Sequence, residues 1–281
     1  MSPSNFAVTI SKVRDGVAET LADDVAVEEP LEIRLGYSTP DGRATRSISI
    51  TMRTPGHDRE LAAGFLYTEG IVHQRQEIAS IEPCGPAAPD SGNHNVIRID
   101  LANGVEVDLG RLQRHFYTTS SCGVCGKTSL EALRVAGAQS QHGNTTRFRR
   151  PALVGVPGAL RSAQLSFDTT GGLHAAAAFS PEGDLITIME DVGRHNAVDK
   201  VLGSLLLNNE LPATGLGLMV SGRASFELMQ KTLLAGMPLL AAISAPSSLA
   251  VQLAREFHMS LIGFLRGDTF NIYAGAERIV E

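Results

Sequence analysis

The sequence contains no tryptophan, only 3 cysteines and few aromatic side chains, which make up 5% of its 281 residues. An odd cysteine count, and a start without a basic segment followed by an apolar one, argue against secretion and against a permanent disulfide. No apolar run reaches the roughly 18 residues that a membrane-spanning helix needs. We therefore expect a cytoplasmic protein that does not contact a membrane.

Positive charge is also scarce. Lys and Arg number 24 against 30 Asp and Glu, which gives a formal net charge of -6. Because a nucleic-acid-binding surface normally shows a basic excess, we predict no nucleic-acid partner. A phosphate-bearing ligand would have to be bound by a local group of basic residues. The apolar share of 43% allows a large core, in either one or two domains.

Two of the cysteines lie close together, as Cys122 and Cys125 within SSCGVCGKT at 120–128. Thr128 and Glu131 have the spacing of a capping box, which predicts that a helix begins there. The positive end of that helix favours a thiolate, so we expect the pKa of both thiols to lie below the ordinary value of about 8.5. The thiolate is the reactive form of cysteine, and this stretch is therefore the candidate catalytic loop.

Two other interpretations of the cysteine pair remain open. C-x2-C is also half of a common zinc site, which Cys84, His115 or His142 could complete. The pair could also form a disulfide with each other, although the odd cysteine count and the absence of a secretory signal argue against a permanent one. The spacing alone indicates sulfur or redox chemistry without deciding the matter.

The first 115 residues are predicted to form a small α+β domain. Residues 1–28 are expected to be loose apart from a short strand at 6–10, and residues 83–95 are expected to form a loop that contains Cys84. The elements predicted from alternation, helix spacing and turn residues are a hairpin of 31–35 with 48–52, a helix opening at Thr54-Pro55 and ending at Gly70, and a hairpin of 96–99 with 105–109.

Residues 116–150 are predicted to contain the C-x2-C catalytic loop, its helix and a basic linker. Arg147, Arg149 and Arg150 lie close together in this linker. Such a cluster is usually a solvated surface, and less often a contact for an anionic partner.

Residues 151–281 are predicted to form the cofactor-binding domain. From residue 171 strands and helices alternate, which predicts a largely parallel sheet with helices on both faces. The predicted strands are 173–179, 185–189, 216–220, 239–243, 260–265 and 270–273, and the predicted helices are 197–205, 226–234 and 249–257. The first two strands form a hairpin around Pro181-Glu182-Gly183-Asp184. The overall fold class is thus α/β, or α+β when the small domain is included.

Three junctions between strands and helices share small, hydroxyl or basic residues: 191–196, 221–225 and 244–248. In a parallel sheet they would meet at the carboxyl edge, where such folds bind ligands. Backbone N–H groups near Gly193 and Gly222, with Arg194 and Arg223, could then bind a phosphate or diphosphate. The alternative at each junction is ordinary helix capping, and for His195 a hydrogen-bonded cap or core position.

Four segments resemble a known family: SCGVCG at 121–126, EDVGRHNAVDK at 190–200, SGR at 221–223 and the strands around 264–273. Together they are similar to the formate dehydrogenase accessory sulfurtransferase family, FdhD, over nearly the whole chain after residue 30. The resemblance implies a homodimer whose larger domain has the three-layer α/β/α fold of cytidine deaminases.

The resemblance also implies a function. The protein is expected to be a sulfurtransferase that accepts a persulfide from a cysteine desulfurase on Cys122, with Cys125 in the same loop, and delivers the sulfur to molybdenum bis(molybdopterin guanine dinucleotide) for formate dehydrogenase. A guanine nucleotide would mimic this bound substrate, and no metal site or zinc is expected. The residues expected to bind the cofactor are Phe264, Leu265, Arg266, Gly267, Asp268, Thr269, Gly193, Arg194, His195, Ser221, Gly222 and Arg223.

Three other functions would fit parts of the pattern. A zinc deaminase needs a His or Cys followed by x-Glu, and P-C-x-x-C, and neither motif is present: Asn196-Ala197 follows His195, and no proline precedes Cys122. A C-x2-C thiol oxidoreductase and a chaperone that binds the molybdenum cofactor without sulfur chemistry remain as alternatives. Replacing Cys122 by Ser separates the chaperone from the carrier.

Overall fold

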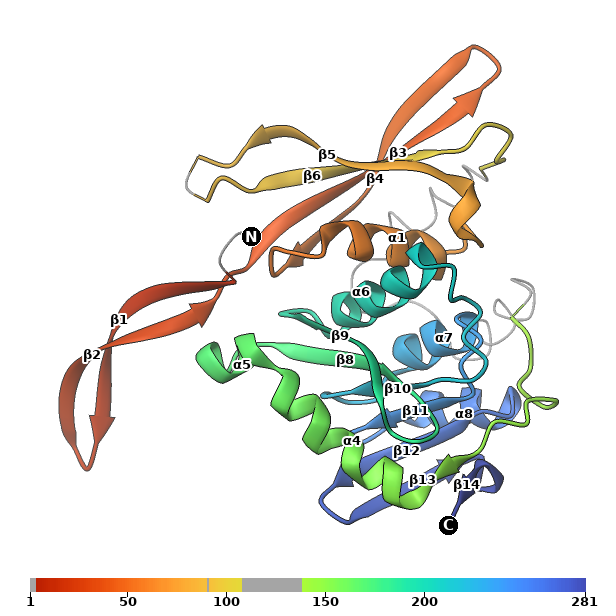
Figure 1. Cartoon of the computed structure of the whole chain (residues 1–281). Coiled ribbons are helices and arrows are strands. Elements are labelled where there is room, and N and C mark those ends of the chain that lie inside the picture. Colours follow the sequence, from red (N-terminus) through yellow and green to blue (C-terminus); the bar gives the residue numbers. More distant parts are fainter. Residues whose placement is uncertain (1–3, 90, 108–137) are drawn as a thin grey trace.

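The computed structural model describes residues 4–89, 91–107 and 138–281. These residues form stacked layers: a small sheet, a layer of helices, a large sheet and a second layer of helices (Figure 1). A two-stranded ribbon extends away from these layers. The C-x2-C stretch and its predicted helix lie outside the described residues.

The ribbon is a correction to the sequence prediction, which expected loose structure in most of residues 1–28. β1 (Asn5–Arg14) and β2 (Val17–Ala26) pair in register along their whole length. Asp15 and Gly16 form the turn and both have positive φ, 52° and 80°. Asp-Gly is a strong signal for a tight hairpin turn, because these residues tolerate that backbone conformation better than most others. Weak alternation in the strands concealed the hairpin.

The small sheet has the strand order β4-β3-β6-β5. Its strands are β3 (Glu29–Thr39), β4 (Gly42–Arg53), β5 (Ile78–Ala87) and β6 (His94–Leu101). The predicted β3-β4 hairpin is confirmed, with Thr39 opposite Gly42. Buried Leu31, Ile33 and Leu35 form its core face.

The second predicted hairpin of this region is wrong. β6 pairs with β3 in parallel and with β5 antiparallel, while 105–107 form no strand. The predicted loop at 83–95 is wrong at both ends, because 83–87 belong to β5 and 94–95 to β6. Cys84 lies in β5 opposite Val96. The prolines and glycine around Cys84 masked a strand whose pairing partner comes later in the chain.

The layer between the two sheets consists of α1 (Asp58–Thr68) and α6 (Arg194–Leu207), which pack against each other. The predicted helix after Thr54-Pro55 is confirmed as α1. Gly64 and Gly203 lie at the crossing: a Cβ on Gly64 would overlap the carbonyl oxygen of Asp199, and one on Gly203 that of Glu60. Glycine is therefore required at both positions, because the two helix backbones are in contact.

The large sheet has six strands in the order β13-β12-β11-β10-β8-β9. Their bounds are β8 (His174–Phe179), β9 (Leu185–Asp191), β10 (Gly217–Val220), β11 (Leu239–Ala242), β12 (Ser260–Arg266) and β13 (Thr269–Ala274). All six predicted strands are confirmed in position. The prediction of a largely parallel sheet is wrong, since only β10, β11 and β12 pair in parallel. Tight turns join β8 to β9 and β12 to β13, and a tight turn forces antiparallel pairing.

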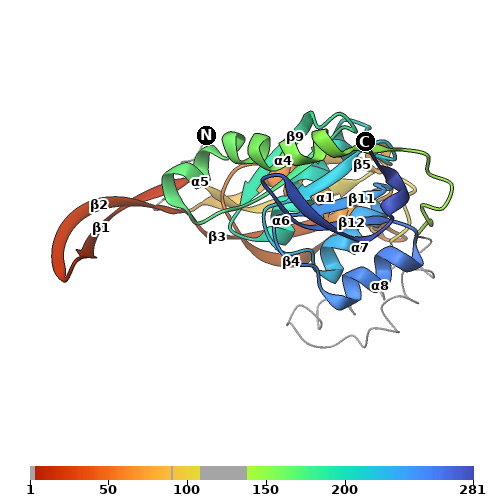
Figure 2. The same ribbon diagram turned by 90° about the horizontal axis from the view of Figure 1, so that it is seen from below.

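Helices cover both faces of the large sheet, so the three-layer α/β/α arrangement is confirmed. α4 (Arg150–Ala163) and α5 (Leu165–Thr170) lie on one side, and α7 (Phe226–Leu234) and α8 (Ser248–Glu256) on the other (Figure 2). α6 covers β8 and β9 beside α7. The three helices predicted from periodicity are α6, α7 and α8.

The expected linker is only partly irregular, because residues 148–150 belong to regular elements. β7 (Phe148–Arg149) pairs in parallel with β14 (Ile279–Val280), and Phe148 is fully buried. Because Arg149 and Arg150 follow Phe148 in the sequence, its burial was not predicted. The sequence also gave no indication of α4, since Pro157 lies inside it. The described residues also contain single-turn 3-10 helices at Arg75–Glu77 and Ala276–Arg278.

Candidate functional site

The three predicted junctions lie at one edge of the large sheet. β9, β10 and β11 run in the same direction, because β8 is antiparallel to both β9 and β10 while β10 and β11 are parallel. Backbone hydrogen bonds link the junctions: Ser244 N donates to Gly222 O at 3.4 Å, and Phe264 N donates to Ser244 O at 3.2 Å. This carboxyl edge, made of residues 191–196, 221–225, 244–248 and 264–269, is the candidate site.

The helices that begin at this edge are capped differently. Ser225 Oγ accepts from Leu228 N at the start of α7, and Ser247 Oγ accepts from Ala250 N at the start of α8. Among the residues that the structure describes, no side chain caps α6, and its first turn has no acidic residue. At these two junctions capping is thus confirmed as the role of the serines, whereas the N–H groups in the first turn of α6 have no such cap at the positive end of the helix.

The first turn of α6 carries Arg194 and His195, so positive charge lies at a positive helix end. Arg194 Nε and His195 Nε2 are buried atoms without a hydrogen-bond partner among the described residues. His195 Nε2 lies 3.8 Å from Glu227 Oε2, too far for a hydrogen bond. Interaction with His195 lowers the pKa of the Glu227 carboxyl to about 2, against the opposing effect of partial burial. The arrangement suits an anionic ligand, which would offset the charge of Arg194 and the helix dipole.

Other residues of the same motif have a structural role. Asp191 is fully buried and lies 2.8 Å from the ammonium of Lys200. Its carboxylate also accepts from Gly193 N, Asn196 Nδ2 and Thr54 N. Because Thr54 follows β4, an edge strand of the small sheet, this buried pair joins the small sheet to α6 and β9. Gly193 is thus fixed by Asp191, while Arg194 and His195 remain available.

The second junction contributes one exposed cation. Ser221 is used within the fold, since its Oγ accepts from Ala175 N at 2.9 Å. Gly222 lies beside His174, and a Cβ at Gly222 would stand 3.5 Å from Nδ1 of that histidine. The exposed Arg223 has no ion pair among the described residues. Arg223 can therefore reach a ligand, whereas Ser221 supports the loop.

The predicted segment 264–269 spans the end of β12, the two-residue turn after it and the first residue of β13. Phe264 has φ of 53°, which is strained for a bulky residue, and its side chain is 39% exposed. Leu265 is fully buried, so its side chain cannot contact a ligand at the surface. Arg266 Nε donates to Ile243 O at 2.9 Å. Gly267 has φ of 51°, Asp268 is exposed, and Thr269 Oγ1 donates to Arg266 O. Phe264 is the side chain of this segment most available for stacking.

His174 was missed by the sequence reasoning. It begins β8, opposite Asp191, and its charge interacts with those of Arg194 and His195. Burial and Arg194 lower the pKa of this histidine. The sequence offered no signal for it, because only the pairing of β8 with β9 and β10 places it at the edge.

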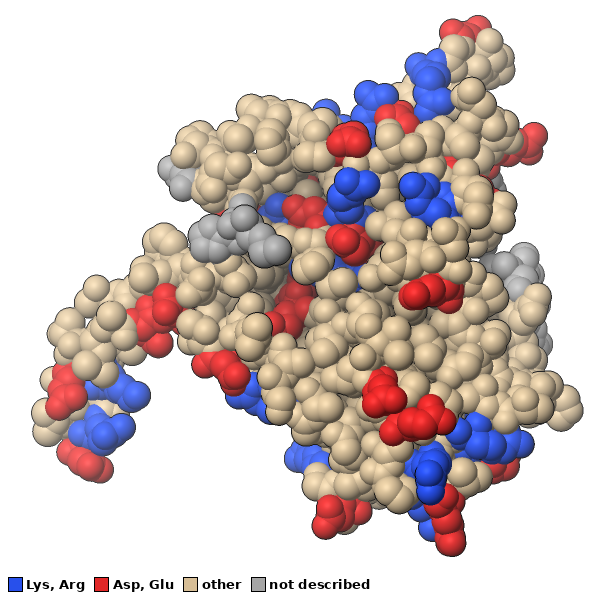
Figure 3. Space-filling view, viewed as in Figure 1, with Lys and Arg blue, Asp and Glu red and all other residues tan. Residues whose placement is uncertain are grey.

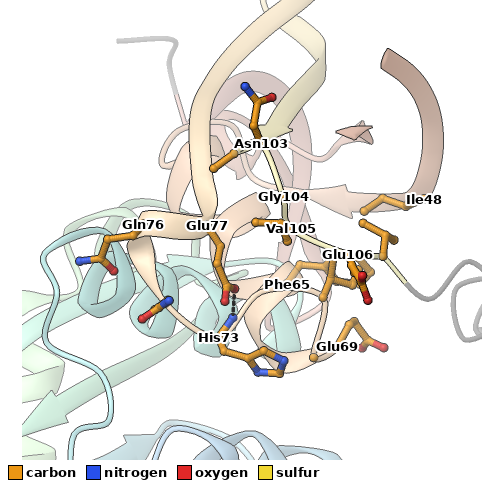
Figure 4. A pocket seen from close by; sticks show the side chains of 15 residues that line it. Ile48, Phe65, Glu69, His73, Gln76, Glu77, Asn103, Gly104, Val105 and Glu106 are labelled. Atoms are coloured by element: carbon orange, nitrogen blue, oxygen red, sulfur yellow. Dashed lines mark hydrogen bonds between the residues drawn. The ribbon is translucent and has the colours of Figure 1, made fainter. Parts of the chain in front are cut away.

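A hollow in the protein lies elsewhere. It has a volume of about 680 Å³ at the C-terminal end of α1 (Figure 4). Phe65, Val105, Glu69 and Glu106 are among its lining residues, and His73 N donates to Glu77 Oε2 on its wall. Gln76, also on the wall, donates from Nε2 to Oδ1 of Asn209, just beyond the C-terminal end of α6. At 1.5 Å per residue, Asn209 lies about 20 Å from the start of that helix. The hollow is therefore separate from the carboxyl edge.

Within the described part of the chain, no three His, Cys, Asp or Glu side chains come together as a metal site. Cys84 lies in β5, and His142 packs against His258. His115, Cys122 and Cys125 lie outside the described residues, so the absence of zinc stays a prediction. Each described helix is too short or too polar to cross a membrane. Acidic and basic side chains are interspersed on the face in Figure 3.

Comparison with known proteins identifies the family. The model of the FdhD/NarQ family matches residues 26–280. A protein of Streptomyces coelicolor named sulfur carrier protein FdhD is 49% identical over 273 residues, 96% of this chain and 94% of its own. Its namesake in Saccharolobus solfataricus is 41% identical over 268 residues, 95% of each chain.

A solved structure agrees with these relatives. The crystal structure described as a formate dehydrogenase accessory protein from Desulfotalea psychrophila superposes with a TM-score of 0.74 at 25% sequence identity. It covers 99% of this chain, and 100% of the solved chain is matched. Sequence and fold therefore agree along nearly the whole length, and the chain belongs to the FdhD/NarQ family.

Proposed function

We propose that the protein is a sulfur carrier for the maturation of formate dehydrogenase. In this proposal Cys122 accepts a persulfide sulfur from a cysteine desulfurase, and the protein passes it to molybdenum bis(molybdopterin guanine dinucleotide) bound at the carboxyl edge. Relatives named sulfur carrier proteins, matched over nearly the whole chain, support the general role. The observation that carries the choice of ligand is the uncapped start of α6 beside Arg194 and His195.

The carboxyl edge has the chemistry that a dinucleotide requires. Backbone N–H groups at the start of α6 and the charge of Arg194 and Arg223 would bind the diphosphate, since charge-assisted hydrogen bonds are stronger than neutral ones. The exposed ring of Phe264 would stack on the guanine base. Leu265 would contribute only its backbone, because its side chain lies in the core. A guanine nucleotide should therefore bind here as a mimic of the cofactor.

The sulfur would be carried by thiol exchange. The thiolate of Cys122 attacks the terminal sulfur of the donor's persulfide, so a new S–S bond forms on Cys122 while the donor's S–S bond breaks and its thiolate leaves. Cys125, three residues away, could stabilise or release that sulfur by a second exchange. A zinc-bound thiolate would be less available, so the proposal includes no zinc. The homodimer implied by family resemblance also belongs to this proposal.

The test is to load the protein with sulfur and then ask whether it activates formate dehydrogenase. Incubation with a cysteine desulfurase and cysteine should add one sulfur atom to the wild type, as seen by mass spectrometry. Cys122→Ser should abolish both this gain and the activation. Cys84→Ser is the matched control, because Cys84 lies in a strand of the small sheet, and it should behave as wild type.

Other outcomes identify the alternatives. If Cys122→Ser loses the added sulfur but still activates the enzyme, the protein is a cofactor chaperone and the carrier proposal is wrong. Stoichiometric zinc in the purified protein would also contradict it. If the purified pair cycles between dithiol and disulfide with no sulfur gain, the oxidoreductase alternative is favoured instead.

A further inference from the structure

We propose that His174 is a further ligand-binding residue of the carboxyl edge, and that it takes up a proton when a diphosphate binds there. Binding would then be coupled to pH. This inference rests on the proposed function, because it needs a diphosphate-bearing ligand at the start of α6. It adds a residue that neither the sequence motifs nor the printed names of the relatives indicate.

The position of His174 supports a role at the ligand. The residue lies between two junctions, since β8 pairs with β9 on one side and with β10 on the other. The Nδ1–Cε1 edge of its ring lies beside Gly222, where an added Cβ would stand 3.5 Å from Nδ1 and 3.6 Å from Cε1. The glycine therefore places no side chain against this edge of the ring, at the same junction as Arg223.

The ring of His174 is not used by the fold. Its Nδ1 and Nε2 make no hydrogen bond to another described residue, although buried polar groups of this protein such as Asp191 and Lys200 are fully paired. A histidine with a structural role normally has such a partner. The free ring nitrogens of a partly buried histidine can instead donate to a ligand.

The charges around His174 explain why an anion would change its protonation. Burial and the neighbouring Arg194 and His195 of α6 lower the pKa of His174 in the free protein. Asp191 of β9 acts in the opposite direction, but it already pairs with Lys200. A diphosphate beside Arg194 would reverse the balance, because its negative charge stabilises the imidazolium.

The sign of the pH effect follows from this. His174 is neutral above its lowered pKa in the free protein and charged below a higher pKa in the complex, so the complex binds a proton that the free protein lacks. Affinity should therefore rise as pH falls from 8 to 6, by at most about tenfold per pH unit for one proton. Replacing the imidazole of His174 should abolish this dependence of affinity on pH and leave the affinity at pH 8 almost unchanged.

The experiment is calorimetry with GDP-mannose as the probe, since its diphosphate is a diester and does not titrate between these pH values. Titration in two buffers of different ionisation enthalpy gives the number of protons taken up. Wild type should take up a proton on binding, and His174→Gln should bind without it. His94→Gln, which changes an exposed histidine of the small sheet, should behave as wild type. Circular dichroism of each variant checks that it is folded.

The outcomes separate this inference from the function on which it rests. If the wild type binds no GDP-mannose at any pH, the proposed nucleotide site is wrong and the inference fails with it. If the wild type binds without proton uptake, or folded His174→Gln retains the full uptake, only the inference is overturned. Loss of the uptake in His195→Gln but not in His174→Gln would assign the proton to His195 and likewise overturn it.

Discussion

At the residue scale, neighbouring positions of one motif have opposite roles. Asp191 and Lys200 are buried and paired within the protein, whereas Arg194 keeps a buried nitrogen without a described partner. The sequence motif alone does not distinguish the residues that are paired within the fold from the one that is available to a ligand. Phe264 is another individual case, because its strained backbone is retained at an edge where the aromatic ring is partly exposed. Such strain is typical of functional positions.

We predict that Phe264→Ala weakens the binding of a guanine nucleotide without destabilising the protein. Loss of one stacked base should cost about 1–3 kcal/mol, or about 5- to 150-fold in affinity. Titration calorimetry measures the affinity, and Phe6→Ala in the exposed ribbon is the control that should leave it unchanged.

Phe264→Gly adds a second readout. Glycine adopts positive φ without strain, so this variant should be more stable than Phe264→Ala by about 1 kcal/mol and bind equally poorly. Normal affinity in both variants would show that Phe264 does not contact the base.

At the element scale, the crossing of α1 and α6 determines how the small sheet is placed over the large one. Gly64 and Gly203 allow the two helix backbones to touch. A second connection lies beside it, where Lys231 of α7 bonds both Asp199 of α6 and Thr68 of α1. Glycine in a helix is normally a cost of about 0.5–1 kcal/mol relative to alanine, so its presence here needs the tertiary contact as a reason.

We predict that Gly203→Ala destabilises the protein by about 3 kcal/mol, at the upper end of overpacking effects, because the new methyl group would overlap backbone atoms that cannot move aside. Gly155→Ala is the matched control. Gly155 lies inside α4 and a Cβ there would meet nothing within 4 Å, so this change should stabilise by about 0.5–1 kcal/mol.

Urea denaturation followed by far-ultraviolet circular dichroism measures both free energies of unfolding. If Gly203→Ala were as harmless as Gly155→Ala, the close approach of α1 and α6 would be wrong.

At the scale of the whole molecule, a buried ion pair connects the two sheets. Lys200 lies 2.8 Å from Asp191, donates to the carbonyls of Thr54 and Glu190, and is 1% exposed. Thr54 ends the small sheet's hairpin region, while Glu190 and Asp191 belong to the large sheet. Because Lys200 has partners in both parts of the structure, breaking the ion pair should destabilise both sheets together.

We predict that Lys200→Met lowers the free energy of unfolding by about 3–5 kcal/mol, because Asp191 would remain buried without its cation. The loss should appear in a single transition of both sheets in urea. Lys12→Met, an exposed change in the ribbon, should stay within about 0.5 kcal/mol of wild type. A loss in Lys200→Met as small as in this control would refute the connecting role of the pair.

The sequence by itself determined the elements whose signals are local. Hydrophobic periodicity and turn residues placed α6, α7, α8 and the strands of the large sheet to within a few residues. It also identified the three strand-to-helix junctions as one group, and its motifs indicated the family to which the chain belongs. These signals succeed because each depends on residues that are neighbours in the chain.

Only the tertiary structure decided which residues meet. The pairing of β6 with β3 and β5, the buried place of Phe148 and the position of His174 depend on partners far away in the chain. The sequence could not separate the structural Asp191 from the available Arg194 either, because burial is a property of the packed layers. Local patterns fix elements, whereas contacts between distant segments fix the charge balance and the geometry of the site.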